Sequence, residues 1–395
     1  MATATVSRGS RAFVATGVAF LVAWQAAVVA GLGRSAALAL GLYGFVFHVV
    51  FGKAYALVPS YFARELAFPR APFVHLPLAA AGAACRFAGE AGLASPTVAF
   101  AGAVLWLAGA LVFVGALGWT VRDNLSGRET GTGAVDEHRL TVDRVANAAV
   151  PVVLAYLLAG AALPVLDGVG LAPAVLPANG PPASHLLAAG AGALLLFAVG
   201  FRLLPRFLVA DPRPALVYAV LPAGAAAPAL LAGDFLGGLP FRLGAALQAS
   251  AVVGFAAAYA DLYRRSERRR VGFPAVLAAV GFGVVAVALG LWFAFVGVDA
   301  AALDAHYRLA VGGFLALSIV GVSYQFYPPS VATRRGVDDR TAAASVGLFA
   351  SGIALEAGGL LVDAPAAAAL GRWLALAGAA VYAAILAVLF VERPV

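Results

Sequence analysis

The chain has 395 residues, of which 63% are hydrophobic and only 11% are charged, and its formal charge is +7. Because a soluble globular domain has about 25% charged residues, this composition predicts a protein of the lipid bilayer. The arginines are spread through short segments between apolar runs, which excludes a nucleic-acid partner, and the single cysteine, Cys85, excludes an intramolecular disulfide and a cysteine-based metal cluster.

A transmembrane helix needs about 20 mostly apolar residues. Twelve segments meet this length, so the sequence predicts an all-α integral membrane protein with a single transmembrane domain, 1–395. The expected spans are 11–33, 36–59, 72–92, 96–121, 143–166, 183–209, 214–236, 240–263, 273–298, 303–328, 341–362 and 368–391. The first apolar run begins near Phe13 and is long enough to span, so no cleavable signal peptide is expected.

Arginine placement predicts the orientation of these spans. If the N-terminus is cytoplasmic, the inner side collects most of the arginines, including those of the expected cytoplasmic loops 122–142 and 264–272. The opposite loops hold little beyond Arg34, Arg242 and Arg372. Since positive charge is retained on the cytoplasmic side, we expect both termini inside the cell and a multi-pass protein of the plasma membrane.

The second and tenth expected spans share a pattern of residues. Gly, Phe, Gly, Tyr and Pro coincide without a gap at a constant offset of 269, from Gly44 to Pro59 and from Gly313 to Pro328. The sixth span has a weaker echo at 200–205. These spans are four apart, which predicts three four-helix units over 11–121, 143–263 and 273–391. Chance likeness is the alternative, because Gly and Pro are frequent in such helices.

This plan resembles subunit I of the haem-copper oxidases, whose tenth helix begins with a haem-ligating His and ends in an aromatic run followed by Pro. Here His306 and Pro328 have the same separation, and 321–328 reads Gly-Val-Ser-Tyr-Gln-Phe-Tyr-Pro. The chain also resembles the NnrS family, membrane haem proteins linked to the nitric-oxide response, in length, three-fold layout and the segment 201–207. The resemblance implies bound haem and a respiratory-chain partner.

The chain departs from the oxidase pattern at three places. Arg308 stands where a second His is expected, and the position of the low-spin haem ligand, near Ala36, is apolar. No adjacent pair of histidines exists for a copper centre. Oxygen reduction at a bimetallic site is therefore not expected, and the sequence assigns no other enzymatic activity.

Three histidines are candidate metal ligands. His185 and His306 each lie one turn into a span that runs from outside to inside, so both are expected near the outer boundary, in different units. His48 lies deeper, in the second span. Neutral imidazole suits haem iron or copper. The alternatives are interfacial helix caps for the first two and a proton-relay element for His48.

Three further basic side chains have simpler interpretations. Lys53 is five residues beyond His48, a step of about 140° around a helix, so the two do not share a face. Its stem can reach the headgroups, although an intramembrane ionisable group also favours a functional role. His75 is expected to be a polar end at the membrane interface, and His138 a solvated loop residue.

A second set of polar residues is expected towards the outside. Glu356 lies in the outer third of its span, where an unpaired carboxylate would be costly, and Arg308 is its expected partner. Arg86 and Glu90 are spaced for an ion pair along one helix face. With His185 and His306 they form a predicted outer polar cluster, whose arginines suit either haem propionates or an anionic solute.

Three functions therefore remain open. The first is a protein that binds haem or copper, through His306 with help from His48 or His185, for electron transfer, nitric-oxide handling or haem sensing. The second is a secondary transporter of a small solute, and the third is a non-catalytic subunit of a respiratory complex. Three repeats of four helices favour the first, whereas two repeats of six favour the second. Phosphate-loop, zinc-protease and nucleophile-elbow motifs are absent from the sequence.

Overall fold

The computed structural model describes residues 2–172 and 180–393. Within these ranges every regular element is a helix, and eleven helices are long and apolar enough to cross a membrane. A twelfth, α4 (Ala71–Glu90), is 20 residues long and carries His75, Arg86 and Glu90. The predicted all-α multi-pass membrane fold is confirmed.

The twelve expected spans all occur as helices. In chain order, the elements are α1 (Ala2–Val29), α2 (Arg34–Leu38), η1 (Ala39–Val46), α3 (Phe47–Tyr61), α4, α5 (Pro96–Val121), η2 (Ala134–Arg139), α6 (Leu140–Gly168), α7 (Pro181–His185), η3 (Leu186–Ala193), α8 (Leu194–Leu208), α9 (Pro214–Gly233), α10 (Leu239–Arg265), α11 (Gly272–Phe295), α12 (Ala300–Tyr307), η4 (Arg308–Ala316), α13 (Leu317–Phe326), η5 (Pro329–Val331), α14 (Asp339–Leu361) and α15 (Pro365–Glu392). The largest difference is at α1, which begins nine residues before the predicted span. Its first turns are polar, so an apolar-run criterion finds only the later part of the helix.

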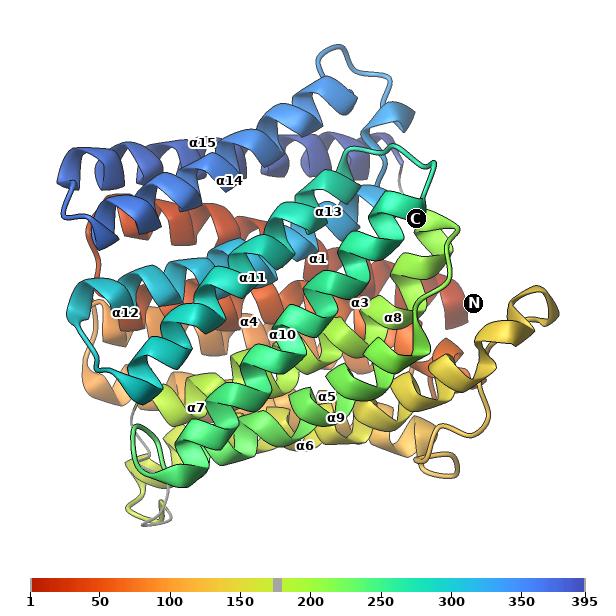
Figure 1. Ribbon diagram of the computed structural model, residues 1–395, viewed down its shortest axis with the longest axis horizontal. Helices are drawn as coiled ribbons and strands as arrows, with labels where there is room; N and C mark the ends of the chain where they lie inside the picture. The colour runs from red at the N-terminus through yellow and green to blue at the C-terminus, as the bar shows by residue number, and fades with distance from the viewer. Residues whose placement is uncertain (1, 173–179, 394–395) are drawn as a thin grey trace.

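The two ends of the helix bundle differ in charge. Both termini lie at one end, together with the segment before α6 and the connection from α10 to α11 (Figure 1). Arg11 donates a hydrogen bond to the Phe390 carbonyl across the two termini. We call this the arginine-rich end, because it carries the segments 122–144 and 264–270. The opposite end carries the starts of α2, α7 and α12.

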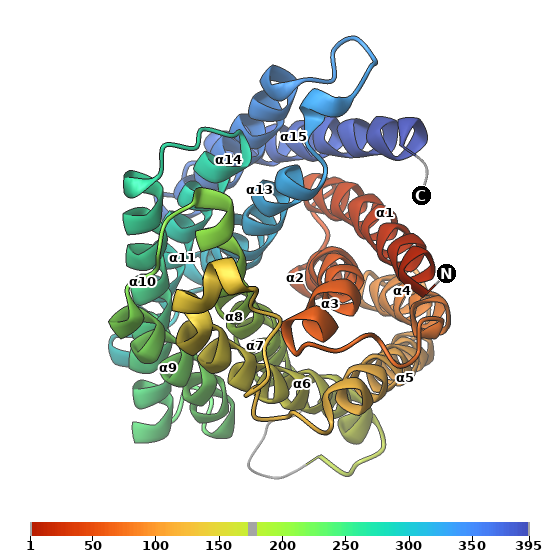
Figure 2. The ribbon, with the colours of Figure 1, turned by 90° about the vertical axis from the view of Figure 1, so that its right-hand side faces the viewer.

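Three central spans are distinguished by burial and helix geometry. They are α2–η1–α3, α7–η3–α8 and α12–η4–α13, and each contains a π-helical segment. Their apolar stretches are 83%, 78% and 72% buried, against 56% or less in the other candidate spans. Seen from the arginine-rich end, α3, α8 and α13 lie inside the surrounding helices (Figure 2). π segments widen a helix locally and often accompany functional sites. The central spans are therefore the expected location of a functional site.

The remaining spans also recur with a period of four. The most extensive helix contacts are made by three hairpins, α4 with α5, α9 with α10, and α14 with α15. Each hairpin follows a central span. This arrangement supports the predicted three-unit repeat, which itself stays a prediction.

The three central spans enclose an apolar cavity of about 110 Å³, lined by residues such as Val50, Leu196 and Ile319. Lys53 also lines this cavity. Its Nζ donates to the Tyr327 hydroxyl at 2.8 Å and lies 4.2 Å from the centres of the Phe326 and Tyr327 rings. Lys53 thus has a protein partner on the third central span, in addition to the reach towards the headgroups that the sequence suggested. It joins the first central span to the third through a hydrogen bond and cation–π contacts.

Two glycines of the shared sequence pattern lie where helices touch. A Cβ at Gly52 would lie 2.8 Å from the Ser10 carbonyl of α1, and a Cβ at Gly321 would lie 2.7 Å from the Gly272 carbonyl of α11. Backbone atoms cannot give way as a flexible side chain can. The absence of a side chain at these positions lets the central spans approach their neighbours closely.

We expect Gly321→Val to lower the free energy of unfolding by about 1–3 kcal/mol, because the added side chain meets the α11 backbone. Thermal unfolding of the purified protein in detergent measures the change. Gly347→Val is the matched control, since Gly347 is exposed and a Cβ there meets nothing within 4 Å. Equal effects of the two substitutions would contradict the close approach of α11 and α13.

Candidate functional site

Two of the candidate ligands, His185 and His306, lie side by side at the end opposite the arginine-rich end. His185 is the last residue of α7 and His306 lies in α12, so they come from the sixth and tenth spans. Their ring centres are 6.3 Å apart, and their ring planes differ by 12°. Two imidazoles that are far apart in the sequence are thus close and nearly parallel.

Hydrogen bonds orient both rings. His185 Nδ1 donates to the Pro181 carbonyl at 2.7 Å, and His306 Nδ1 donates to the Ala286 carbonyl of α11 at 2.9 Å. A carbonyl oxygen only accepts, so each ring carries its proton on Nδ1 and keeps a lone pair on Nε2. Neither Nε2 has a hydrogen-bond partner within the described part of the chain. A backbone carbonyl on the far nitrogen is the usual support of a metal-binding histidine.

His48 is separate from this pair. It is fully buried in α3, its Nδ1 bonds the Tyr43 carbonyl at 3.1 Å, and its ring packs against Phe13 and Phe20. His75 lies nearby and is fully buried too, with the Tyr55 hydroxyl 3.1 Å from its Nδ1. The expectation of an interfacial His75 is corrected, because α4 turns this side chain into an aromatic core. His138, by contrast, is exposed as expected and contacts Asp211, but it lies in the short helix η2 rather than in a loop.

A buried ion pair lies on another face of the tenth span. Arg308 Nε donates to Glu356 Oε2 at 2.7 Å, which confirms the predicted partner. Arg308 Nη2 donates to Gln25 Oε1 at 2.8 Å, and Arg372 Nε lies 3.2 Å from Glu356 Oε1. Arg308 and Glu356 are each only 2% exposed. Two arginines from different spans therefore neutralise one carboxylate.

This ion pair borders a polar cavity of about 250 Å³. We call it the arginine cavity, and its polar lining consists of Arg34, Asp304, Tyr307, Arg308, Glu356 and Arg372. The exposed pair of Arg34 and Asp304, 2.6 Å apart, joins α2 to α12 beside it. Trp24 Nε1 donates to the Tyr307 hydroxyl at 2.7 Å.

The residues of the predicted outer polar cluster lie at separate places in the structure. His306 faces α11, whereas Arg308 faces α1 and α14, because a two-residue step turns about 200° around a helix. The expected pairing of Arg86 with Glu90 is corrected: no ion pair joins these two described residues. The Arg86 guanidinium lies 4.5 Å from the centre of the Tyr43 ring, and Glu90 is exposed.

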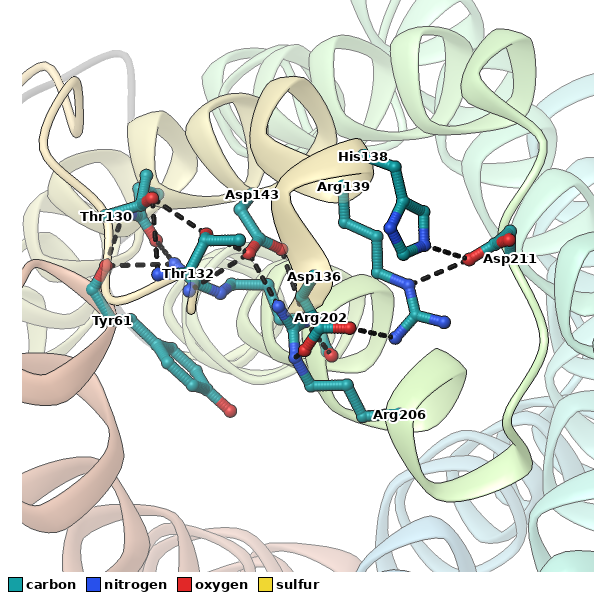
Figure 3. Close-up of polar contacts among 11 residues, drawn as sticks. Tyr61, Thr130, Thr132, Asp136, His138, Arg139, Asp143, Arg202, Arg206 and Asp211 are labelled. Atoms are coloured by element: carbon teal, nitrogen blue, oxygen red, sulfur yellow. Dashed lines mark hydrogen bonds and ion pairs between the residues drawn. The ribbon is translucent and has the colours of Figure 1, made fainter. Parts of the chain in front are cut away.

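A second buried network lies at the arginine-rich end (Figure 3). Asp143, fully buried, accepts from Arg206 Nη2 at 2.8 Å and lies 3.3 Å from Arg202 Nη2. Arg202 also donates to the Tyr61 carbonyl at 3.0 Å and to the Asn147 side chain. These contacts join the second, fifth and sixth spans. At the rim, the Arg139 guanidinium holds the pKa of Asp211 below its usual range.

Sequence reasoning missed several of these residues. Asp143 with Asn147, and Arg202 with Arg206, were available as polar pairs one helical turn apart. Gln25 was visible as a polar residue deep in the first span. Tyr307 and Trp24 carried no such signal, because aromatic residues are common in the apolar spans.

The described residues contain no group of three or more His, Cys, Asp or Glu side chains arranged to hold a metal ion. Any metal held by protein side chains alone would therefore have at most two ligands of these types within the described ranges. Comparison with protein-family models finds no match for the chain, and comparison with curated proteins finds no significant match.

Removing Asp143 tests the network of Figure 3. We expect Asp143→Ala to lower the free energy of unfolding by about 3–5 kcal/mol, because it leaves Arg202 buried beside no carboxylate. Asp211→Ala is the control, since this carboxylate is exposed and its ion pairs contribute at most about 1 kcal/mol. Thermal unfolding in detergent compares the two variants, and a loss no larger for Asp143→Ala than for Asp211→Ala would contradict the structural role.

Proposed function

We propose that the chain is a membrane metalloprotein in which His185 and His306 bind one metal centre, either a haem iron or a copper ion. The observation that carries this proposal is the close, nearly parallel placement of the two imidazoles. The coarser statement, a multi-pass helical membrane protein, is already established by the fold. Electron transfer, nitric-oxide handling or haem handling is the role that follows from the proposed metal.

The ring spacing suits two ligands of one metal. If both rings bound one metal, each Nε2 would lie about 2.0–2.1 Å from it. The ring centres, 6.3 Å apart, are close enough for both imidazoles to reach one ion. Both Nε2 lone pairs remain available, since both Nδ1 atoms are bonded to carbonyls.

The types of ligand that the chain offers favour haem iron over copper(I). Imidazole suits iron and copper, whereas the chain has one Cys and one Met, so it is poor in the soft sulfur ligands that select copper(I). Haem iron is also what the oxidase and NnrS resemblance implies. If haem were bound, His185 and His306 would hold its iron, and the group would supply electron-transfer chemistry.

The residues around the pair fit a weakly solvated metal centre. Phe235 packs 5.0 Å from the His185 ring centre, and Phe293 packs 5.6 Å from that of His306. A Cβ at Gly290 would meet only His306 Cε1 within 4 Å, at 3.6 Å, so α11 leaves space next to this ring. Apolar surroundings of this kind govern solvent access and redox potential at a metal site.

A spectrum of the purified protein tests the assignment. We expect a Soret band in protein prepared with haem supply, or bound copper by metal analysis. Both His185→Ala and His306→Ala should reduce metal occupancy by more than about tenfold, because each removes a direct ligand. His138→Ala is the matched control, since its imidazole is exposed on the short helix η2 at the other end. A colourless, metal-free wild type, or a histidine variant with wild-type occupancy, would contradict the proposal.

We also propose that the arginine-rich end faces the cytoplasm, from the asymmetry of positive charge. Single cysteines in a Cys85→Ser background test this orientation with a membrane-impermeant thiol reagent. Val169→Cys, beyond the end of α6, should be labelled on intact cells, and His138→Cys should be labelled only after lysis. The reverse pattern would invert the topology.

A further inference from the structure

In the lining of the arginine cavity and directly behind it, two buried hydrogen-bond donors have no protein partner. Arg308 lines the cavity and is 2% exposed, yet its Nη1 has no hydrogen-bond partner. The Nε2 of Gln25, whose amide oxygen accepts from Arg308, is also buried without a partner. A buried donor that is left unpaired costs free energy. Two such donors within one hydrogen-bonded group indicate a missing acceptor.

Tyr307 adds a third donor. The indole N–H of Trp24 can only donate, so the Tyr307 hydroxyl accepts that bond and keeps its own hydrogen for another acceptor. Tyr307 lines the cavity beside Arg308. The donors therefore come from two consecutive residues of the tenth span and from Gln25 of the first.

The charge of the lining is unbalanced. Arg34, Arg308 and Arg372 carry one more charge than Asp304 and Glu356 together. Glu356 is already shared between Arg308 and Arg372. The excess is a single positive charge in a partly buried site, where it is less screened than at an open surface. A monovalent anion would neutralise it.

The size of the cavity and its access to solvent further limit the kind of ligand that it can bind. The cavity, at about 250 Å³, is smaller than the roughly 300–1,000 Å³ of pockets that take drug-sized ligands. The pair of Arg34 and Asp304 beside it is about half exposed on both side chains, so the cavity lies next to solvent at this end. A small anion can enter from there with part of its water shell.

We propose that the arginine cavity binds a small monovalent oxyanion, such as a carboxylate or nitrate, through the guanidinium of Arg308, with Tyr307 and Arg372 around it. The oxygens of such an anion supply the acceptors that these donors lack. This site is independent of the proposed metal centre, because Arg308 and His306 face different sides of the tenth span. It is also the observation that favours a solute-binding or solute-transport role.

Anion-dependent stability of the full-length protein tests this site. Thermal unfolding is followed while nitrate or formate replaces chloride at constant ionic strength. A ligand that binds only the folded state raises the unfolding temperature in a saturable way. We expect saturation with at least one of the two anions in the wild type, and an affinity at least about tenfold weaker in Arg308→Lys.

Arg308→Lys keeps a positive charge beside Glu356 but removes the unused guanidinium donor, so it separates binding from folding. Arg372→Gln, at a partly exposed position, is a second variant, and several-fold weaker binding is expected. Arg242→Gln is the matched control, because it removes an exposed arginine at the same end, outside the cavity lining. No saturable response in folded wild type, or an unchanged response in Arg308→Lys, would overturn the proposal. The metal spectrum would be unaffected by either result.

Discussion

The structure depends on one constraint, which is that an arginine inside an apolar helix bundle needs a partner from another helix. Arg308 forms an ion pair with Glu356 at 2.7 Å, and Arg202 forms one with Asp143 at 3.3 Å. Each of these side chains is at most 3% exposed. Removing one partner of such a pair is far more costly than removing an exposed ion pair. These contacts therefore fix which spans lie next to one another at the two ends of the bundle.

The two ends use the same chemistry for different purposes. At the arginine-rich end, Arg202 has three partners on two other helices, since it contacts the Tyr61 carbonyl of α3 and the side chains of Asn147 and Asp143 on α6 (Figure 3). At the opposite end, Arg308 borders a cavity and keeps a donor free. Both arginines keep one buried N–H without a partner, at Arg202 Nε and at Arg308 Nη1, but only Arg308 lines the arginine cavity, where a ligand can bind. That difference, rather than the presence of arginine, separates a structural site from a binding site.

The central spans connect the two ends and carry most of the unusual geometry. Each of the three contains a π segment, and the candidate ligands His185 and His306 lie one and two residues before two of these segments. Lys53 and Tyr327 join the first central span to the third, and Arg308 joins the third to α1. If the three units are related by repetition, the central spans are the corresponding elements, and both proposed sites lie at contacts between different units.

The sequence by itself determined the class of fold, the number of spans, their approximate bounds and the partner of Glu356. These properties follow from local hydrophobic length and from the high cost of an unpaired carboxylate in the bilayer. Only the tertiary structure decided that His306 and Arg308 belong to separate sites, that His48 lies in an aromatic core and that Gln25 reaches Arg308. The physical reason is that a side chain's surroundings depend on which helix faces meet, and those contacts join residues hundreds of positions apart.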